Sequence, residues 1–570
     1  MYKPNKKHQQ PALISAISEL PEKQLKLLKR SWSESFYRDF FCKLNEDIFA
    51  VLYVSEPSRP NVPVNALVGL EVLKAGFGWS DEELFENFCF NLQVRHALGY
   101  DRLGDGDFAI RTLYYFRERL SKHYLETGVN LLKQAFEQVT DIQIEELQVR
   151  TGMQRMDSTQ IASNIVNASR LQLLVEAIQR VYRVMSKVDQ ERLAEVYTPY
   201  IQGTAGQYTY RVKGKQGIQE HLQQAGDAIH YLLLALKDGY ANELAYQVLE
   251  RIFTDNFKLV EEKVRLKEDE EIESGSLQSI DDLEASFRTK GNTNYKGYVV
   301  NLAETCDTKN DLQLVTDIQV APNNVDDTQL LEESLPHLKE RTNLDTLFTD
   351  GGYGSPDTDQ ALKNKQVQQI QTAIKGRKPS EEKLHLSDYE IKQADNGKPT
   401  RITCPNQQSV VVQTTSRKKA FVAHFDRVIC QSCPYSEICP AKPGKRDPDR
   451  HLRFTQDEVY VSQRRRLSQL YLEEGKNPRA AVESTVRQIK HPFPASKLPV
   501  RGQFRVSCMM VGSAIMTNIR RIQHYRMGKT KKNQEIETSK DCSSISFVHF
   551  LRILLKLDKM ASPKLVYFSC

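Results

Sequence analysis

The chain has 570 residues and a formal net charge of +6, and 40% of its residues are hydrophobic. A chain of this length exceeds one ordinary hydrophobic core, so about two to four packed units are expected. No segment reaches the roughly 18 apolar residues that a membrane span needs. The polar start at residues 1–7 lacks the apolar stretch of a secretory signal. The sequence therefore excludes a membrane-spanning class and predicts a cytoplasmic protein.

Positive charge is concentrated in the C-terminal third of the chain. Residues 411–530 hold 23 Lys and Arg against 9 Asp and Glu, a balance of +14 that leaves −8 for the remaining residues. A basic region of this kind is typical of a surface that faces a polyanion. A solvated charged face would show the same balance, so charge alone leaves both interpretations open.

Residues 1–140 are dominated by helical periodicity. One helix is predicted after Pro63, a second from Ser80, where Glu83 completes a capping box, and a third over 110–120. Short helices with an Arg-rich exposed face suit an all-α DNA-binding domain. They suit a packing or dimerisation domain equally well.

From about residue 141 the pattern changes to alternating strands and helices. A strand at 148–162 precedes a helical block at 168–253 and an acidic, loose stretch at 261–284. The elements predicted next are strands at 298–303 and 312–320, a helix at 326–340, a strand at 344–350, a helix from 356 and a strand at 367–374. This mixed α/β order is compatible with a ribonuclease H-like core over 141–525, interrupted by a helical insertion at 165–290 and a Cys-rich insertion at 376–460.

Three acidic residues stand in separate settings within this region. Asp157 lies in the first strand, Asp350 closes a later strand, and Glu483 lies in a predicted helix. Two carboxylates at strand ends and a third on a helix can converge on divalent cations, which take oxygen ligands and keep positions free for water and phosphate. Strand ends are also where α/β sheets place ligands. The alternatives are an Asp that caps the turn at Gly351 and a surface ion pair between Arg479 and Glu483.

The segment that carries Glu483 also carries basic residues. On a helix, Arg479 would lie one turn before Glu483 and Lys490 two turns after it, so the three would share a face. Glu483 could then hold a metal ion while Arg479, Arg487 and Lys490 contact DNA phosphates.

Several short motifs, taken in order, carry a family resemblance. They are Met156-Asp157-Ser158-Thr159, Phe287-Arg288-Thr289-Lys290, Asp350-Gly351-Gly352-Tyr353-Gly354, Val482-Glu483-Ser484-Thr485-Val486-Arg487-Gln488-Ile489-Lys490 and Leu498-Pro499-Val500-Arg501-Gly502. Over residues 30–525 the chain resembles a DDE transposase of bacterial insertion sequences, of the 1182-type family with a helical N-terminal domain and a cysteine-containing insertion. Lys476 stands where the family's helix signature has tyrosine, so the stacking contact at that position is not carried over.

The resemblance implies both a chemistry and a set of partners. Asp157 would bridge two Mg²⁺ (or Mn²⁺) ions, of which Asp350 and Glu483 would each hold mainly one. Water would cut at the element's ends, and the freed 3′-hydroxyl would then attack target DNA. The implied partners are the element's terminal inverted repeats and target DNA, bound by a homodimer or higher oligomer associated with the nucleoid. Two alternatives are a metal-dependent nuclease without joining activity and a catalytically inactive DNA-binding regulator of the element.

Four of the ten cysteines fall close together, at Cys404, Cys430, Cys433 and Cys439. In a reducing compartment such a cluster predicts a structural Zn²⁺ site, with His424 as a substitute ligand. The alternatives are free structural cysteines and a partly degenerate metal site. The tail at 526–570 is basic and then apolar, and is either a docking helix or sequence outside the functional fold.

Overall fold

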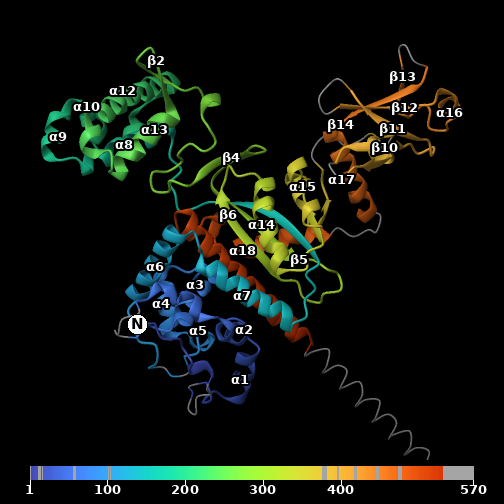
Figure 1. The fold of residues 1–570 in the computed structure, drawn as a ribbon. Helices are drawn as coiled ribbons and strands as arrows, with labels where there is room; N and C mark the ends of the chain where they lie inside the picture. The colour runs from blue at the N-terminus through green and yellow to red at the C-terminus, as the bar shows by residue number, and fades with distance from the viewer. Residues whose placement is uncertain are drawn as a thin grey trace, which may run out of the picture.

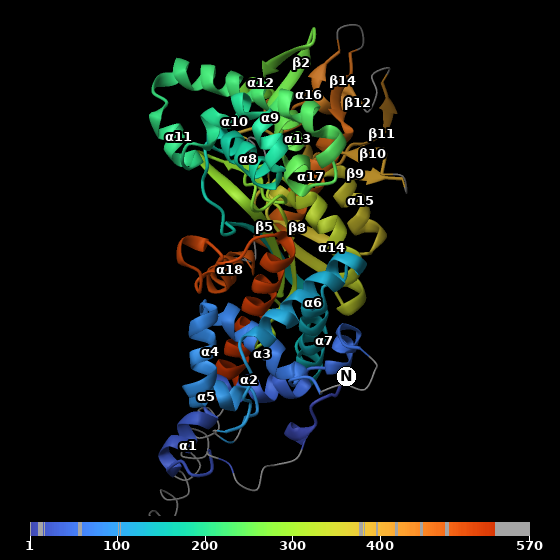
Figure 2. The same cartoon turned by 90° about the vertical axis from the view of Figure 1, so that its left-hand side faces the viewer.

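The computed structural model describes residues 2–9, 15, 17–54, 60–100, 102, 104–374, 380, 382–394, 397–415, 420–444, 448–472 and 478–529. The apolar part of the tail and Lys476 lie outside the described residues. A mixed central sheet lies between an N-terminal helical region and two inserted units (Figure 1). Both views place the inserted units at the end of the sheet away from the N-terminal helices (Figure 2). The predicted mixed α/β class with a helical N-terminal region is confirmed.

The N-terminal region is mainly helical, with a longer connection between α2 and α3 that contains 3₁₀ turns. The bounds of its helices are α1 (Glu22–Lys29), α2 (Trp32–Asp39), α3 (Val64–Phe77), α4 (Asp81–Phe90), α5 (Leu92–Ala97), α6 (Arg111–Thr127) and α7 (Leu131–Glu146). The predicted capping box at the start of α4 is present, because Ser80 accepts from the Glu83 backbone and the Glu83 side chain accepts from the Ser80 backbone. Helix α7 runs past residue 140, where the sequence pattern was expected to change.

The central sheet contains β1 (Met153–Ile161), β4 (Ser286–Lys290), β5 (Thr293–Thr305), β6 (Val315–Pro322), β7 (Thr346–Thr349) and β8 (Gln368–Gln371). Its order is β4-β5-β1-β7-β8, and β6 also pairs with β5. Strand β1 runs antiparallel to β5 and parallel to β7, which is parallel to β8. Helices α14 (Asp327–Arg341) and α15 (Pro356–Asn364) connect the later strands. The predicted order of β1, β5, β6, α14, β7, α15 and β8 is found in the structure, and β4 is a strand that the sequence interpretation missed.

The first insertion is a helical unit with its own hydrophobic core. It contains α8 (Arg170–Val184), α9 (Lys187–Arg192), α10 (Ala194–Ile201), α11 (Ala205–Arg211), α12 (Gly214–Tyr240), α13 (Leu244–Asn256) and the hairpin β2 (Phe257–Val260) and β3 (Lys263–Leu266). The expectation of a loose acidic stretch at 261–284 was wrong at both ends, because β3 occupies its start and residues near its end are buried. Asp282 is buried and accepts hydrogen bonds from Ser163 Oγ (2.6 Å), the Gly502 amide (3.1 Å) and the Tyr298 hydroxyl.

The second insertion is a small antiparallel sheet that lies before the last elements. Its strands are β9 (Glu390–Gln393), β10 (Pro399–Thr403), β11 (Ser409–Thr414), β12 (Ala420–Phe425), β13 (Lys442–Pro443) and β14 (Arg450–Thr455), with α16 (Arg427–Gln431) after β12. Helix α17 (Gln456–Leu472) leads back to the central sheet and packs against β8. An ion pair connects α17 to α15. The Nε and Nη2 atoms of Arg464 on α17 lie 3.0 and 2.5 Å from the two carboxylate oxygens of Asp359 on α15.

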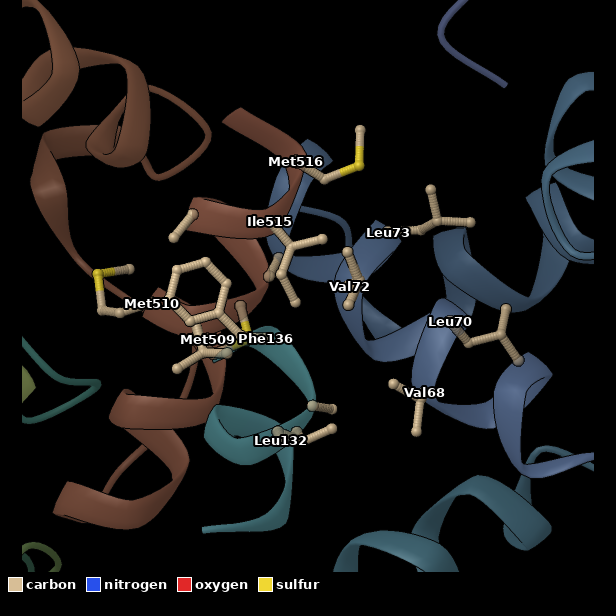
Figure 3. Close-up of a cluster of buried hydrophobic side chains, with 14 of the residues drawn as sticks. Val68, Leu70, Val72, Leu73, Leu132, Phe136, Met509, Met510, Ile515 and Met516 are labelled. Carbon is tan, nitrogen blue, oxygen red and sulfur yellow. The ribbon is translucent and has the colours of Figure 1, made fainter. Parts of the chain in front are cut away.

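A long helix over residues 503–529 joins the C-terminal part of the chain to the N-terminal helices. Its apolar side packs between α3 and α7 (Figure 3), where Met516 and Met510 contribute to one core with Val72 and Phe136. The approach to α3 is close, because a Cβ added at Gly76 would lie 2.1 Å from Met516 Cγ. The N-terminal helices therefore share a continuous core with the C-terminal segment of the predicted catalytic region.

Candidate active site

Asp157 lies in the middle of β1, just beyond the part of the strand that pairs with β7. Its side chain is 12% exposed, and its Oδ1 accepts from the Ser158 amide (3.1 Å) and from Arg479 Nη2 (3.2 Å). Burial raises the pKa of Asp157, and the neighbouring Arg479 charge opposes this shift. The expectation that Asp157 lies at the end of a strand was wrong. Asp157 lies inside β1, at a position where β1 no longer pairs with β7.

Asp350 directly follows β7, so it extends the strand parallel to β1 and comes level with Asp157. Its Oδ1 accepts from the Gly352 amide (2.7 Å) and caps a 3₁₀ turn over Gly351–Tyr353. Its Oδ2 lies 3.7 Å from Arg479 Nη2. The turn-capping alternative and a site role are therefore compatible, because each uses a different carboxylate oxygen.

Arg479 joins the two aspartates. It lies in a 3₁₀ turn over Pro478–Ala481, and the helix α18 (Val482–Lys490) begins only after it. The expectation that Arg479 and Glu483 share one helix face is corrected, since the segment is a tighter turn at Arg479. One guanidinium nitrogen, Nη2, contacts both Asp157 and Asp350. A cation thus already lies between these carboxylates, and oxygen donors around a cation-sized position fit a divalent metal ion.

Glu483 lies in the first turn of α18 and is exposed. The opposite face of the helix, formed by Val482, Thr485 and Ile489, is buried, and α18 packs against β1. Within the described residues, no three His, Cys, Asp or Glu side chains already lie close enough to hold a metal ion. The structure brings Asp157 and Asp350 together and places the helix that carries Glu483 against the same strand.

The two basic residues later in α18 behave differently. Lys490 is half-buried, and its Nζ donates to Thr159 Oγ1 (3.1 Å) and to the Gln160 carbonyl (2.9 Å) on β1. Burial lowers the pKa of Lys490. Arg487 is exposed. In this structure Lys490 fastens α18 to β1, whereas Arg487 faces outward.

Two residues beside the aspartates were missed by the sequence interpretation. Asp327, in the first turn of α14, accepts a hydrogen bond from Ser158 Oγ (2.7 Å), and the buried Tyr353 hydroxyl donates to Asn301 Oδ1 (2.7 Å). Burial raises the pKa of Tyr353 far above its usual range, and the charges of Asp327, Asp157 and Asp350 raise it further. In sequence, Asp327 looks like an ordinary acidic helix start. The topology could have revealed it, because β6 is parallel to β1 and leads into α14 at the same sheet edge.

The four clustered cysteines all belong to the second insertion and are free thiols. Cys404, Cys430 and Cys439 pack against the core of the small sheet, and the Tyr389 hydroxyl lies 3.2 Å from Cys439 Sγ. Burial raises the pKa of Cys430, and the other three cysteines raise it further. Among the described residues, no three of these cysteines lie close enough to hold a metal ion together, so Zn²⁺ binding stays a prediction. His424, the proposed substitute ligand, lies beside His451, with ring centroids 4.2 Å apart and the rings tilted by 58°.

Part of the chain matches a known protein family. Residues 274–519 match the model of the transposase DDE domain. No curated protein and no solved structure gives a significant match. Among the described helices, none combines the length and apolarity needed to cross a membrane. The matched range includes Asp350 and Glu483 but begins after Asp157, which β1 adds from outside that range to the centre of the same sheet. The chain therefore carries the DDE domain of transposases, and its resemblance to DDE transposases is confirmed.

Proposed function

We propose that this transposase cuts DNA at the ends of an insertion sequence of the 1182-type family and joins those ends to target DNA. The observation that carries the proposal is the sharing of one guanidinium nitrogen by Asp157 and Asp350 on adjacent parallel strands. Such a pair of carboxylates is built to hold positive charge. The helix of Glu483 packs against the same strand and supplies the third acidic residue.

The catalytic core that we propose is ribonuclease H-like. The sheet supports this, because β6, β5 and β1 form an antiparallel succession and β7 and β8 add in parallel beyond β1. The connecting helices α14 and α15 and the final helix α18 follow the strands in the order that such a core requires. The two insertions enter after β1 and after β8, so they lengthen connections without interrupting the strand pairing.

Asp157, Asp350 and Glu483 would hold Mg²⁺ or Mn²⁺ in this reaction. When bound, divalent ions activate an attacking hydroxyl and stabilise a leaving oxygen in phosphoryl transfer. We propose that Arg479 binds a DNA phosphate when it is not paired with the aspartates, because the planar guanidinium can donate two parallel hydrogen bonds to phosphate oxygens. Ser158 and Asp327 hold the strand beside Asp157 in place through their 2.7 Å hydrogen bond.

DNA is the proposed partner at several surfaces. The N-terminal helices would read the terminal inverted repeats, and the basic region at 411–530, including the exposed Arg487, would hold phosphate backbone. The shared core of α3, α7 and the 503–529 helix supports a packing role for the N-terminal helices as well. We propose a homodimer or higher oligomer, because two ends of an element must be joined together.

The proposal is tested by following both cutting and joining. Labelled DNA carrying the flanks of the coding sequence is incubated with the full chain, a supercoiled target plasmid and Mg²⁺, with EDTA as the matched control. A transposase gives Mg²⁺-dependent cuts at the element's ends and labelled plasmid. Cuts without labelled plasmid would instead support the nuclease alternative, and repeat binding without cuts would support the inactive regulator.

A further inference from the structure

A buried cluster of charged and polar side chains lies behind the candidate site. Glu304, at the end of β5, is completely buried, and its Oε1 accepts from Arg155 Nε at 2.7 Å. Its Oε2 accepts from Arg521 Nη1 of the 503–529 helix at 2.6 Å. The Thr485 hydroxyl on α18 lies 2.8 and 2.7 Å from the two carboxylate oxygens. Glu304 therefore connects β1, α18 and the C-terminal helix through one carboxylate.

Two of the partners of Glu304 lie within two positions of a proposed site residue in the sequence. Arg155 precedes Asp157 by two positions on β1, so the two side chains lie on the same sheet face. Arg155 Nη1 also donates to the Pro478 carbonyl at 2.5 Å, and Pro478 precedes Arg479. Thr485 follows Glu483 by two positions on α18, which turns the two to different faces of the helix. When Thr485 is fixed against the sheet, Glu483 is directed outward.

The stability of the fold alone does not explain why these charged side chains are buried. Burying charges carries a large desolvation penalty, and a well-packed apolar cluster of the same volume often stabilises a fold as well or better. Hydrogen bonds, however, have a preferred length and direction, so they constrain the rotation and axial position of α18 in addition to the apolar contacts of Val482 and Ile489. The cluster is therefore suited to set geometry.

We infer that Glu304 is a positioning residue: through Thr485 and Arg155 it fixes α18 and the Arg479 turn relative to β1, and so aligns Glu483 with Asp157 and Asp350. The inference rests on the proposed function, since it concerns the same three carboxylates. Arg521 of the 503–529 helix contacts both Glu304 and α18. Its Nη2 donates to Thr485 Oγ1 and to Gln488 Oε1 (3.4 Å).

The test uses Thr485→Val in the full chain, because valine keeps the buried shape and removes only the hydroxyl. Thr485→Ser restores the hydroxyl and serves as the rescue. Thr517→Val is the matched control, since Thr517 is equally buried but donates to Ser513 of its own helix (2.9 Å). Glu304→Gln, which keeps the shape and removes the charge, is a second probe of the same cluster. Circular dichroism and DNA-binding affinity establish that each variant is folded.

The decisive readout is backbone scission by Fe²⁺ with ascorbate and peroxide, which maps the chain segments that surround a bound metal ion. Wild type should be cut near Asp157, Asp350 and Glu483. In Thr485→Val we expect the cut near Glu483 to be lost while those near the aspartates remain, with DNA cleavage roughly tenfold or more slower and DNA affinity unchanged. Thr485→Ser and Thr517→Val should resemble wild type.

The two possible failures are distinguishable. If wild type shows no Fe²⁺-dependent scission at any of the three segments, the metal site itself, and with it the proposed function, is wrong. If wild type is cut at all three segments and folded Thr485→Val and Glu304→Gln keep the wild-type scission pattern and cleavage rate, the site stands and the positioning role of Glu304 is overturned.

Discussion

Arg479 Nη2 lies 3.2 Å from Asp157 Oδ1, although the two residues are 322 positions apart in the chain. The same nitrogen lies 3.7 Å from Asp350 Oδ2. The guanidinium therefore compensates part of the negative charge of the two aspartates. A divalent ion that enters between these carboxylates must displace Arg479, and this competition has a measurable consequence.

Replacement of Arg479 should tighten metal binding while it impairs catalysis. Arg479→Gln removes the competing charge, and a hydrogen bond to a charged group contributes about 1.5–3 kcal/mol, so Mn²⁺ affinity should rise by roughly tenfold or more. DNA cleavage should slow, because the phosphate contact is lost. Titration calorimetry with Mn²⁺ measures the affinity, and Arg479→Lys is the matched control. Weaker Mn²⁺ binding in Arg479→Gln would contradict the competition.

Gly352 keeps the space between two carboxylates open. A Cβ added there would lie 2.6 Å from Asp327 Oδ2 and 2.8 Å from Asp350 Oδ1, so Gly352→Ala should push these side chains apart. We expect the rate of DNA cleavage to fall by about a hundredfold, since small displacements of reacting groups have effects of this size. DNA-binding affinity should stay unchanged. Gly275→Ala is the control, because its nearest neighbour, Asn324 Nδ2, is 3.5 Å away. A normal cleavage rate in Gly352→Ala would show that this spacing is not needed.

Local features of the fold could be predicted from the sequence, and long-range contacts could not. The Ser80–Glu83 capping box and the strand before Asp350 depend on neighbouring residues, so a short window of sequence contains their cause. Arg479 and Asp157 are different. Their contact depends on how β1 and the turn before α18 meet in three dimensions, and no local pattern encodes that meeting.

The burial of Glu304 is a second feature that could not be predicted from the sequence. The predicted strand covered residues 298–303 and therefore left Glu304 out. In the structure β5 continues to Thr305, and Glu304 is completely buried because Arg155 and Arg521 compensate its charge. Burial of a charged residue depends on partners that lie 149 and 217 positions away. Periodicity cannot supply such partners.

The stability of the chain should be sensitive to added volume at the close contact between α3 and the 503–529 helix. Gly76→Val places new methyl groups against Met516, and overpacking of this kind costs about 1–3 kcal/mol. The thermal unfolding midpoint should fall. Met516→Ala added to Gly76→Val should recover part of the loss, since it makes room for the valine. If the double variant were no more stable than Gly76→Val, the contact between these two helices would be misplaced.

The cysteine cluster predicts one bound zinc ion per chain. Cys430→Ser should lower the zinc content of the purified protein and destabilise the second insertion, because structural zinc sites contribute directly to folding. Cys89→Ser, in the N-terminal helix α4, is the matched control and should keep the metal. Elemental analysis checks both. A folded, metal-free wild-type preparation would rule the site out.

Cleavage by isosteric variants of the three acidic residues tests the central proposal most directly. Asp157→Asn, Asp350→Asn and Glu483→Gln each remove a negative charge and keep the side-chain shape, so each should lose Mg²⁺-dependent cleavage of the element's ends. Binding to the same DNA, measured in parallel, should remain close to wild type, because recognition of the ends uses other surfaces. Loss of cleavage in all three with retained binding is the result we predict. Near-normal cleavage in two of the three variants would contradict the assignment of Asp157, Asp350 and Glu483 as the catalytic carboxylates.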